Sequence, residues 1–129
     1  MRVHHIGYYV NDLKSAMEKF AFLGYEKTSG PTEDSDRGVS ICFMRNGHET
    51  VELIAKLGEN SMVESLAEKG MSTPYHICYE AEDMDRALKE LKEAGFYLTR
   101  PPAPAAACGG KRVAFLFQKA TGLIEIVEK

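Results

Sequence analysis

The chain has 129 residues, of which 44% are hydrophobic and 27% are charged, and its formal net charge is −3 at pH 7. This length suits one domain with its own core, and the composition is ordinary for a soluble globular protein. The negative net charge gives no reason to expect a nucleic-acid partner. No apolar run approaches the roughly 18 residues of a membrane span, so no membrane partner is expected.

The cysteines and the N-terminal sequence indicate the cellular compartment in which the protein is expected. Cys42, Cys78 and Cys108 are odd in number and show no CxxC spacing, which favours free thiols in a reducing compartment over a disulfide framework. The N-terminus leads directly into a strand pattern, so no signal peptide is expected. We therefore expect a cytoplasmic protein.

The first half of the chain alternates between strand and helix patterns. Residues 3–10, VHHIGYYV, are rich in β-branched and aromatic side chains, which predicts a strand. Residues 11–24 have helical spacing, with Asn11 or Asp12 as N-cap and Gly24 at the end. Further strands are predicted at 25–29, 39–47 and 50–56, with a polar stretch at 30–38 and a hairpin turn at NGHE.

The second half repeats this order. Residues 75–81, YHICYEA, predict a strand, residues 82–95 a helix and residues 96–100 a short strand. A Pro/Ala/Gly-rich loop is expected at 101–110. The segments KRVAFLFQKATG and LIEIVEK then predict a strand, a turn and a final strand. The linker at 57–74 holds a short predicted helix at 62–68.

An internal repeat relates the two halves. With a constant shift of 71 and no gap, six identities align: His5/His76, Ile6/Ile77, Tyr8/Tyr79, Asp12/Asp83, Ala16/Ala87 and Gly24/Gly95. Glu52 in VELI matches Glu125 in IEIV. The repeat predicts two βαβββ modules, at about 1–56 and 75–129, joined by the linker 57–74 in a single domain of residues 1–129. Two copies are too few for a solenoid and more naturally pair their sheets around a common cleft.

Strand parity assigns the repeated histidines to a face of the predicted sheet. Side chains alternate between the two faces of a strand. Ile6 and Tyr8 suit the face under the apolar side of the helix, which sends His5 to the opposite, concave side. The same parity places Ile77 under the second helix and sends His76 to the concave side.

Two glutamates interrupt otherwise hydrophobic strands at matching positions, Glu52 in TVELI and Glu125 in LIEIV. A buried carboxylate without a partner costs several kcal/mol, so each one needs a partner. Two imidazoles and two carboxylates at matched positions point to one divalent cation as the common partner. For each residue alone, a solvent-facing glutamate or a structural histidine is the ordinary alternative.

At this point the chain resembles the vicinal oxygen chelate superfamily, which includes glyoxalase I, methylmalonyl-CoA epimerase, extradiol dioxygenases and fosfomycin- and bleomycin-resistance proteins. The resemblance covers essentially the whole chain and rests on HHIGYYVNDL, TVELIAK, YHICYEAEDMDRALKELKEAG and KRVAFLFQKATGLIEIVEK. It implies an α+β fold in which two tandem βαβββ modules form a U-shaped mixed sheet around a metal cleft, usually within a homodimer. It also implies that the ligands of a divalent ion (Ni²⁺, Co²⁺, Zn²⁺ or Mn²⁺) are His5, Glu52, His76 and Glu125.

The activity that the resemblance implies depends on this ligand set. Four ligands of this kind resemble glyoxalase I and methylmalonyl-CoA epimerase, and both enzymes remove a proton next to a carbonyl group. The first expectation is a lactoylglutathione lyase (glyoxalase I)-like enzyme acting on a methylglyoxal–thiol hemithioacetal. Methylmalonyl-CoA epimerase is the alternative, and a small-molecule binding or resistance protein on the same fold is the alternative from another class. Glu125 is the expected base, with Glu52 as the second carboxylate.

Short sequence motifs support both enzymes. HHIG, VELI and HICYE are close to epimerase motifs, whereas Phe117-Gln118 and AACGGK depart from them. The segments LGY and STPYHICYE resemble those of small bacterial glyoxalase I-like chains. An epimerase needs a second base on the other face of its substrate, and Asp36 aligns best with the residue that supplies it in that family. An exposed loop is the alternative for Asp36.

Binding of the substrate is expected to involve cations. Thiol conjugates of glutathione and of CoA are both anionic, so Arg37, Lys111 and Arg112 near the cleft mouth are expected to bind the small-molecule substrate. Ordinary surface charge is the alternative for each of them. His4 and His48 are expected not to be ligands, because parity turns His4 away from the cleft and His48 sits in a turn.

Overall fold

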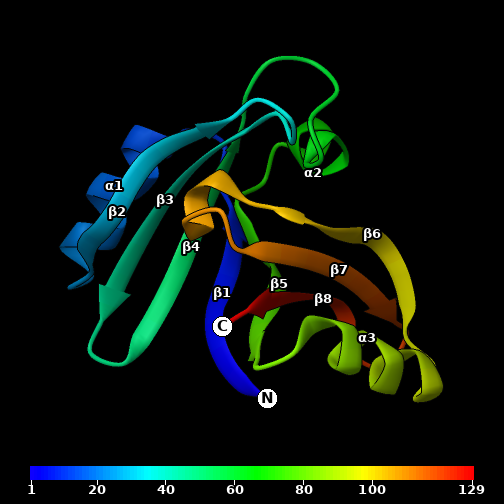
Figure 1. The fold of residues 1–129 in the computed structure, drawn as a ribbon. Helices are drawn as coiled ribbons and strands as arrows, with labels where there is room; N and C mark the ends of the chain where they lie inside the picture. The colour runs from blue at the N-terminus through cyan, green and yellow to red at the C-terminus, as the bar shows by residue number, and fades with distance from the viewer. The chain divides into compact units, whose positions relative to one another are not determined.

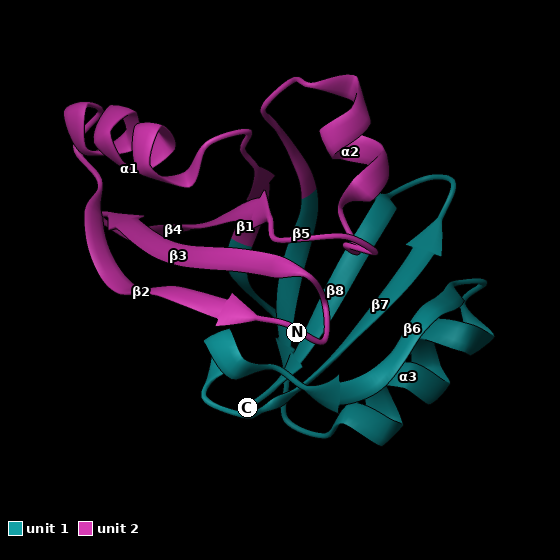
Figure 2. Cartoon of the chain, turned by 90° about the horizontal axis from the view of Figure 1, so that it is seen from above, with its two compact units in different colours: residues 1–5, 76–129 teal, residues 6–75 magenta.

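The structure, a computed structural model, describes residues 1–129 and contains eight strands, three α-helices and one short 3₁₀ helix. The chain divides into two compact units (Figure 2). One unit comprises residues 1–5 and 76–129, and the other comprises residues 6–75. No helix is long and apolar enough to cross a membrane, and none of the three cysteines forms a disulfide.

The unit of residues 6–75 contains the first module and the linker. Its elements are β1 (Arg2–Tyr9, whose first four residues belong to the other unit), α1 (Leu13–Phe22), β2 (Glu26–Asp34), β3 (Val39–Asn46), β4 (Glu49–Lys56) and α2 (Glu64–Lys69). The strand order is β2-β3-β4-β1 (Figure 1), with β1 parallel to β4 and the other pairs antiparallel. The short helix expected in the linker is α2.

The other unit contains the second module. Its elements are β5 (Thr73–Ala81), α3 (Met84–Glu93), β6 (Tyr97–Pro104), the 3₁₀ helix η1 (Ala106–Cys108), β7 (Arg112–Gln118) and β8 (Gly122–Glu128). The first three residues of β5 belong to the unit of residues 6–75. The strand order is β5-β8-β7-β6, with β5 parallel to β8. The predicted α+β fold of two βαβββ modules is therefore confirmed. The metal cleft, and the single-domain organisation over residues 1–129, stay predictions.

The repeat extends to details of the backbone. Asp12 caps α1 by accepting a hydrogen bond from the Ser15 backbone N–H, and Asp83 caps α3 in the same way from Arg86. These carboxylates satisfy backbone donors that the first turn of a helix leaves unpaired. Each helix is followed by a glycine at φ near +100°, a conformation that costs glycine little.

Each module packs its helix against one face of its own strands. In the first module, α1 covers a cluster that includes Val10, Cys42 and Leu53. In the second, α3 lies against β6–β8 (Figure 1), and its Met84 and Leu88 pack with Ile124 and Ile126 of β8. Burial of these side chains favours the folded state by about 1.5–3 kcal/mol each. Tyr8 packs on the cluster under α1, as strand parity predicted. Ile77, which parity placed under the second helix, is instead exposed, so that prediction was wrong.

Two strands are longer than the sequence indicated. The polar stretch at 30–38 was expected to be non-regular, but β2 continues through Pro31 to Asp34. The loop expected at 101–110 is strand β6 as far as Pro104, followed by η1. Both predictions were wrong for the same reason. β2 and β6 each pair with a single neighbour, and proline is tolerated on such strands because its missing N–H removes no bond from the inner ladder.

Candidate metal centre

Three of the four predicted ligands meet within the unit of residues 1–5 and 76–129. Oε2 of Glu125 lies 3.1 Å from Nε2 of His5 and 3.1 Å from Nε2 of His76. The two imidazole side chains are 0% exposed and the carboxylate is 4% exposed. The imidazole rings meet edge to face, with centroids 5.6 Å apart. One carboxylate oxygen is thus shared by two buried imidazoles.

Strand register explains how His76 reaches Glu125. β5 and β8 pair in parallel, and the Cα partner of Glu125 is Cys78. His76 precedes Cys78 by two residues and so shares its face of the strand. Ile124 and Ile126 point to the opposite face, into the cluster under α3. The alternation that buries the isoleucines therefore aims Glu125 at the imidazole.

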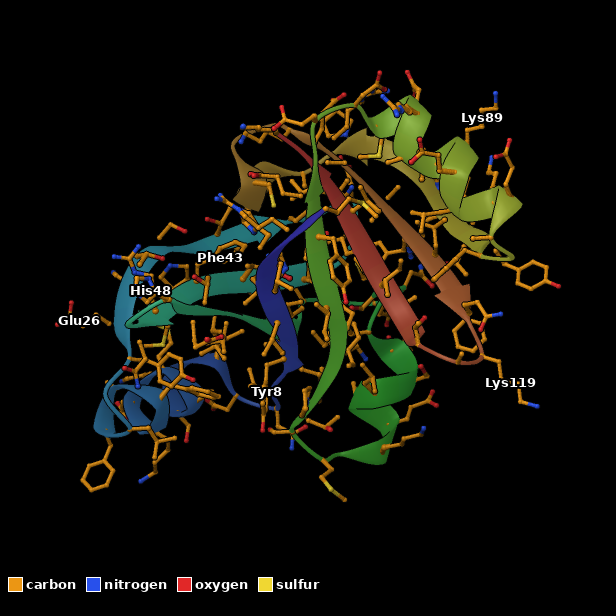
Figure 3. The ribbon with its side chains drawn as sticks, turned by 90° about the horizontal axis from the view of Figure 1, so that it is seen from below. Tyr8, Glu26, Phe43, His48, Lys89 and Lys119 are labelled. Atoms are coloured by element: carbon orange, nitrogen blue, oxygen red, sulfur yellow. The ribbon has the colours of Figure 1, made fainter.

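Phe115 supports this arrangement from β7. It is the Cα partner of Glu125 on the other side of β8, and its ring meets the His76 imidazole edge-on at a centroid distance of 5.3 Å. Phe115 was not predicted as part of the site, although the repeat carries a signal for it. Phe43 on β3 (Figure 3) is the Cα partner of Glu52, as Phe115 is of Glu125.

Glu52, the fourth predicted ligand, belongs to the unit of residues 6–75. It lies on β4 and is 4% exposed, which is unusual for a glutamate. Its Cα partner on β1 is Gly7, and His5 precedes Gly7 by two residues along the same strand. In strand register, Glu52 is therefore to His5 what Glu125 is to His76.

Electrostatics favour an ionised carboxylate at Glu125. Burial by itself raises the pKa of this carboxyl group, but hydrogen bonds from His5 and His76, with the attraction of their charge, outweigh burial and lower the pKa to about 2. Glu125 is therefore an anion at neutral pH.

His4 contacts the same group from its outer side. Nδ1 of His4 lies 2.8 Å from Nδ1 of His5, and the ring centroids are 5.1 Å apart. Burial, followed by repulsion from the His5 imidazole, lowers the pKa of His4. Strand parity predicted that His4 points away from the site. Its ring contacts His5 at Nδ1, the ring nitrogen other than the one that faces Glu125.

The donor set fits a divalent cation. The ligand atoms of His5, His76 and Glu125 lie within 4.8 Å of one another, and all three residues are buried. Imidazole nitrogen and carboxylate oxygen are ligands of Zn²⁺, Ni²⁺, Co²⁺ and Mn²⁺. A divalent cation would also balance the negative charge of the buried Glu125 carboxylate, which lies between the two imidazoles.

Two of the three cations predicted to bind substrate, Arg37 and Arg112, have carboxylate partners within the chain. Arg112 donates two hydrogen bonds to Glu128, at 2.9 and 2.8 Å, and lies 3.6 Å from Asp85 of α3. The Glu128 carboxylate raises the pKa of Arg112 further. This fork joins β7 to β8, which favours a structural role for Arg112. Lys111, directly before it, is exposed.

The polar loop between β2 and β3 separates its acidic residues. Asp34 is buried and accepts hydrogen bonds from the backbone N–H and the guanidinium of Arg37, at 3.1 and 3.0 Å. Asp36 is exposed in the turn that follows. The role of Arg37 in substrate binding and that of Asp36 as a base stay predictions.

Residues 4–115 match the model of the Glyoxalase/Bleomycin resistance protein/Dioxygenase superfamily. The chain belongs to this superfamily. It is 33% identical over 119 residues to an ethylmalonyl-CoA/methylmalonyl-CoA epimerase of Cereibacter sphaeroides, covering 92% of this chain and 89% of that protein. The superfamily membership that the sequence motifs indicated is thereby confirmed.

Two solved structures show the same fold. A hypothetical protein of Bacillus halodurans C-125 superposes with a TM-score of 0.87 at 27% identity, covering 99% of this chain and 94% of that one. The methylmalonyl-CoA epimerase of Mycobacterium tuberculosis superposes with a TM-score of 0.84 at 23% identity, covering 98% of this chain and 87% of that one.

The comparisons correct one prediction. The expectation of a lactoylglutathione lyase acting on a methylglyoxal–thiol hemithioacetal was wrong, because the relatives found over nearly the whole chain are epimerases. The comparisons support an enzyme of this superfamily, of the epimerase type and not of the lyase type. The four-ligand pattern misled because both activities use a metal to acidify a C–H next to a carbonyl. The pattern therefore carries no information on the substrate.

Proposed function

We propose that the protein is a metal-dependent epimerase of an α-substituted malonyl-CoA thioester, with ethylmalonyl-CoA and methylmalonyl-CoA as the first substrates to test. The observation that carries this proposal is the 33% identity to the Cereibacter sphaeroides epimerase over 92% of the chain. The buried group of His5, His76 and Glu125 supports it from the chemistry of the site.

The proposed ligands of the metal are His5, Glu52, His76 and Glu125. Glu52 joins the other three because its register against β1 repeats that of Glu125 against β5, and because a buried glutamate needs a partner. A divalent ion such as Co²⁺, Ni²⁺, Zn²⁺ or Mn²⁺ would supply a Lewis acid for the charge that develops on the thioester oxygen.

The protein's own task in this reaction is to move one proton. The C2 hydrogen of such a substrate lies between a thioester carbonyl and a carboxylate, so its removal leaves a delocalised anion. Inversion requires removal from one face and return to the other, hence two groups. We assign the first to Glu125, whose Oε1 is the oxygen left to take the proton since Oε2 faces both imidazoles. Asp36 is the candidate for the second.

Proton transfer by Glu125 requires a change in its surroundings. A carboxylate with a pKa of about 2 is a weak base, and general bases work best when their pKa lies near the working pH. The two imidazole hydrogen bonds cause the low value. An imidazole whose Nε2 lone pair is a ligand donates no proton from that atom, so these two hydrogen bonds to Glu125 are absent when His5 and His76 act as ligands.

The substrate would bring its anionic CoA moiety to the cations near the site. Lys111 is the best placed of the three predicted cations for this task, because it is exposed while Arg112 is held by Glu128 and Arg37 by Asp34. The small-molecule partner is therefore a CoA thioester, and a homodimer remains the expected assembly.

Solvent exchange tests the proposal directly. Protein loaded with Co²⁺ is incubated in D₂O with (2R)- or (2S)-methylmalonyl-CoA and with ethylmalonyl-CoA, and the C2 proton is followed by NMR while chiral analysis follows inversion. We expect metal-dependent loss of the C2 signal together with racemisation. Methylglyoxal with glutathione is the control and should give no S-lactoylglutathione. Absence of both exchange and inversion for every CoA ester would refute the proposal.

A further inference from the structure

His5 uses both of its ring nitrogens. Its Nε2 lies 3.1 Å from Oε2 of Glu125, and its Nδ1 lies 2.8 Å from Nδ1 of His4. His5 itself is buried, whereas His4 is exposed on the outer side. The two histidines thus form a short chain of polar contacts that runs from the exposed His4 ring to the buried carboxylate.

The contact between the two Nδ1 atoms restricts the tautomers. One of the two atoms must carry the proton and the other must offer a lone pair. If Nε2 of His5 is to bind a cation, it must carry a lone pair, which places the proton of the neutral ring on Nδ1. His5 is then the donor and His4 the acceptor.

We propose that His4 is a positioning residue for His5: its Nδ1 accepts the hydrogen bond from Nδ1–H of His5, which orients the His5 ring and keeps its Nε2 lone pair available to a cation. This inference rests on the metal site of the proposed function and extends it to an outer residue. A histidine ligand commonly donates its second ring N–H to such a partner, which fixes both its tautomer and its orientation.

The arrangement is specific to the first module. With the shift of 71 that pairs His5 with His76, the counterpart of His4 is Tyr75, which has no ring nitrogen. The repeat therefore does not require a histidine at this position. An exposed histidine in the middle of a strand is also not required for packing. The hydrogen bond to His5 accounts for both facts.

Co²⁺ affinity tests the inference without any substrate. Isothermal titration is run on the full chain and on His4→Ala, His4→Asn and His4→Asp, with His48→Ala as the matched control, since His48 is an exposed histidine at the β3–β4 turn (Figure 3). His4→Ala should lower the affinity by about 10–100-fold, as is typical for loss of such an outer partner. His4→Asn and His4→Asp keep an acceptor oxygen and should restore most of it. His48→Ala should change nothing.

Two further measurements separate the outcomes. Ring ¹⁵N chemical shifts of the metal-free protein should show altered His5 nitrogens in His4→Ala and unaltered ones in His48→Ala. The Co²⁺ absorption spectrum should change in His4→Ala and recover in His4→Asn. Equal affinity of His4→Ala and the unmodified chain would overturn the inference alone, as would His4→Asn binding as weakly as His4→Ala. Failure of the unmodified chain to bind Co²⁺ would overturn the metal site itself, and this inference with it.

Discussion

Nε2 of His76 lies 3.1 Å from Oε2 of Glu125, and the two residues come from strands that pair in parallel, β5 and β8. The pair is fully buried within one unit, and His5 completes it from β1. We expect His76→Ala to weaken Co²⁺ binding by more than about 100-fold, because loss of a ligand exceeds the typical loss for an outer partner. Isothermal titration measures this, with circular dichroism to verify folding.

The control for this prediction is His48→Ala, which removes an exposed histidine from a turn. Its affinity should equal that of the unmodified chain. If His76→Ala and His48→Ala bind Co²⁺ equally well, His76 is not a ligand.

The buried group of His5, His76 and Glu125 was predictable from the sequence because it depends on strand alternation and on the internal repeat. Strand alternation gave the direction of His76 and Glu125, and the repeat linked them to His5 and Glu52. Phe115 was harder to find, since a phenylalanine in an apolar strand is indistinguishable from core until the β7–β8 register is known. The contact of His4 with His5 depends on ring rotamers, which strand parity does not specify.

The C-terminal parts of strands β2 and β6 were not predicted, for another reason. Pro31 and the prolines of β6 argue against a strand by local propensity, and only the topology reveals that both strands lie at a sheet end. The type of reaction was mispredicted because the proposed ligands alone do not specify it. The same four donors suit a lyase and an epimerase, so only similarity along the whole chain separated them.

Phe115 should contribute to stability and to the metal site together. Phe115→Ala removes a buried ring that contacts His76, and such a change typically costs about 3–5 kcal/mol of the free energy of unfolding. Urea unfolding of the metal-free protein measures this loss. Phe115→Leu keeps most of the volume and should cost less, while the Co²⁺ affinity falls in both variants because the ring edge against the imidazole is lost. Unchanged affinity in both would assign Phe115 to the core alone.

Lys111 and Arg112 are adjacent in sequence but should behave differently. Lys111→Met should raise the KM for the CoA ester, with a rise that shrinks at high salt because exposed charges are screened. Arg112→Met should leave the KM unchanged, since its guanidinium is held by Glu128. Steady-state kinetics at two salt concentrations measure both. A larger effect on KM from Arg112→Met than from Lys111→Met would reverse this assignment.

Asp36 can be tested as the second base by separating exchange from inversion. An epimerase that loses one of two bases should still exchange the C2 proton of the epimer facing the other base, but it should not invert that carbon. We expect Asp36→Asn to retain exchange of one methylmalonyl-CoA epimer in D₂O while racemisation falls by about 10²–10⁴-fold. Glu33→Gln changes a neighbouring exposed carboxylate and is the control. Full racemisation by Asp36→Asn would remove Asp36 from the mechanism.

The pKa of Glu125 predicts how the metal-free protein responds to acid. The folded-state pKa, about 2, lies below the ordinary value of 4.5. The folded state therefore releases this proton more readily than the unfolded chain, and ionised Glu125 stabilises the fold at every pH above about 4.5. This contribution is lost as the pH falls from about 4.5 towards 2, where the carboxylate becomes protonated in both states.

Urea unfolding in EDTA across pH 3–7 measures this dependence for the unmodified chain and for Glu125→Gln. The amide of the variant does not titrate, so the difference in the free energy of unfolding between the two proteins should be constant above about pH 5 and decrease below it. A difference that stays constant down to pH 3 would mean that Glu125 is not held as an anion by His5 and His76.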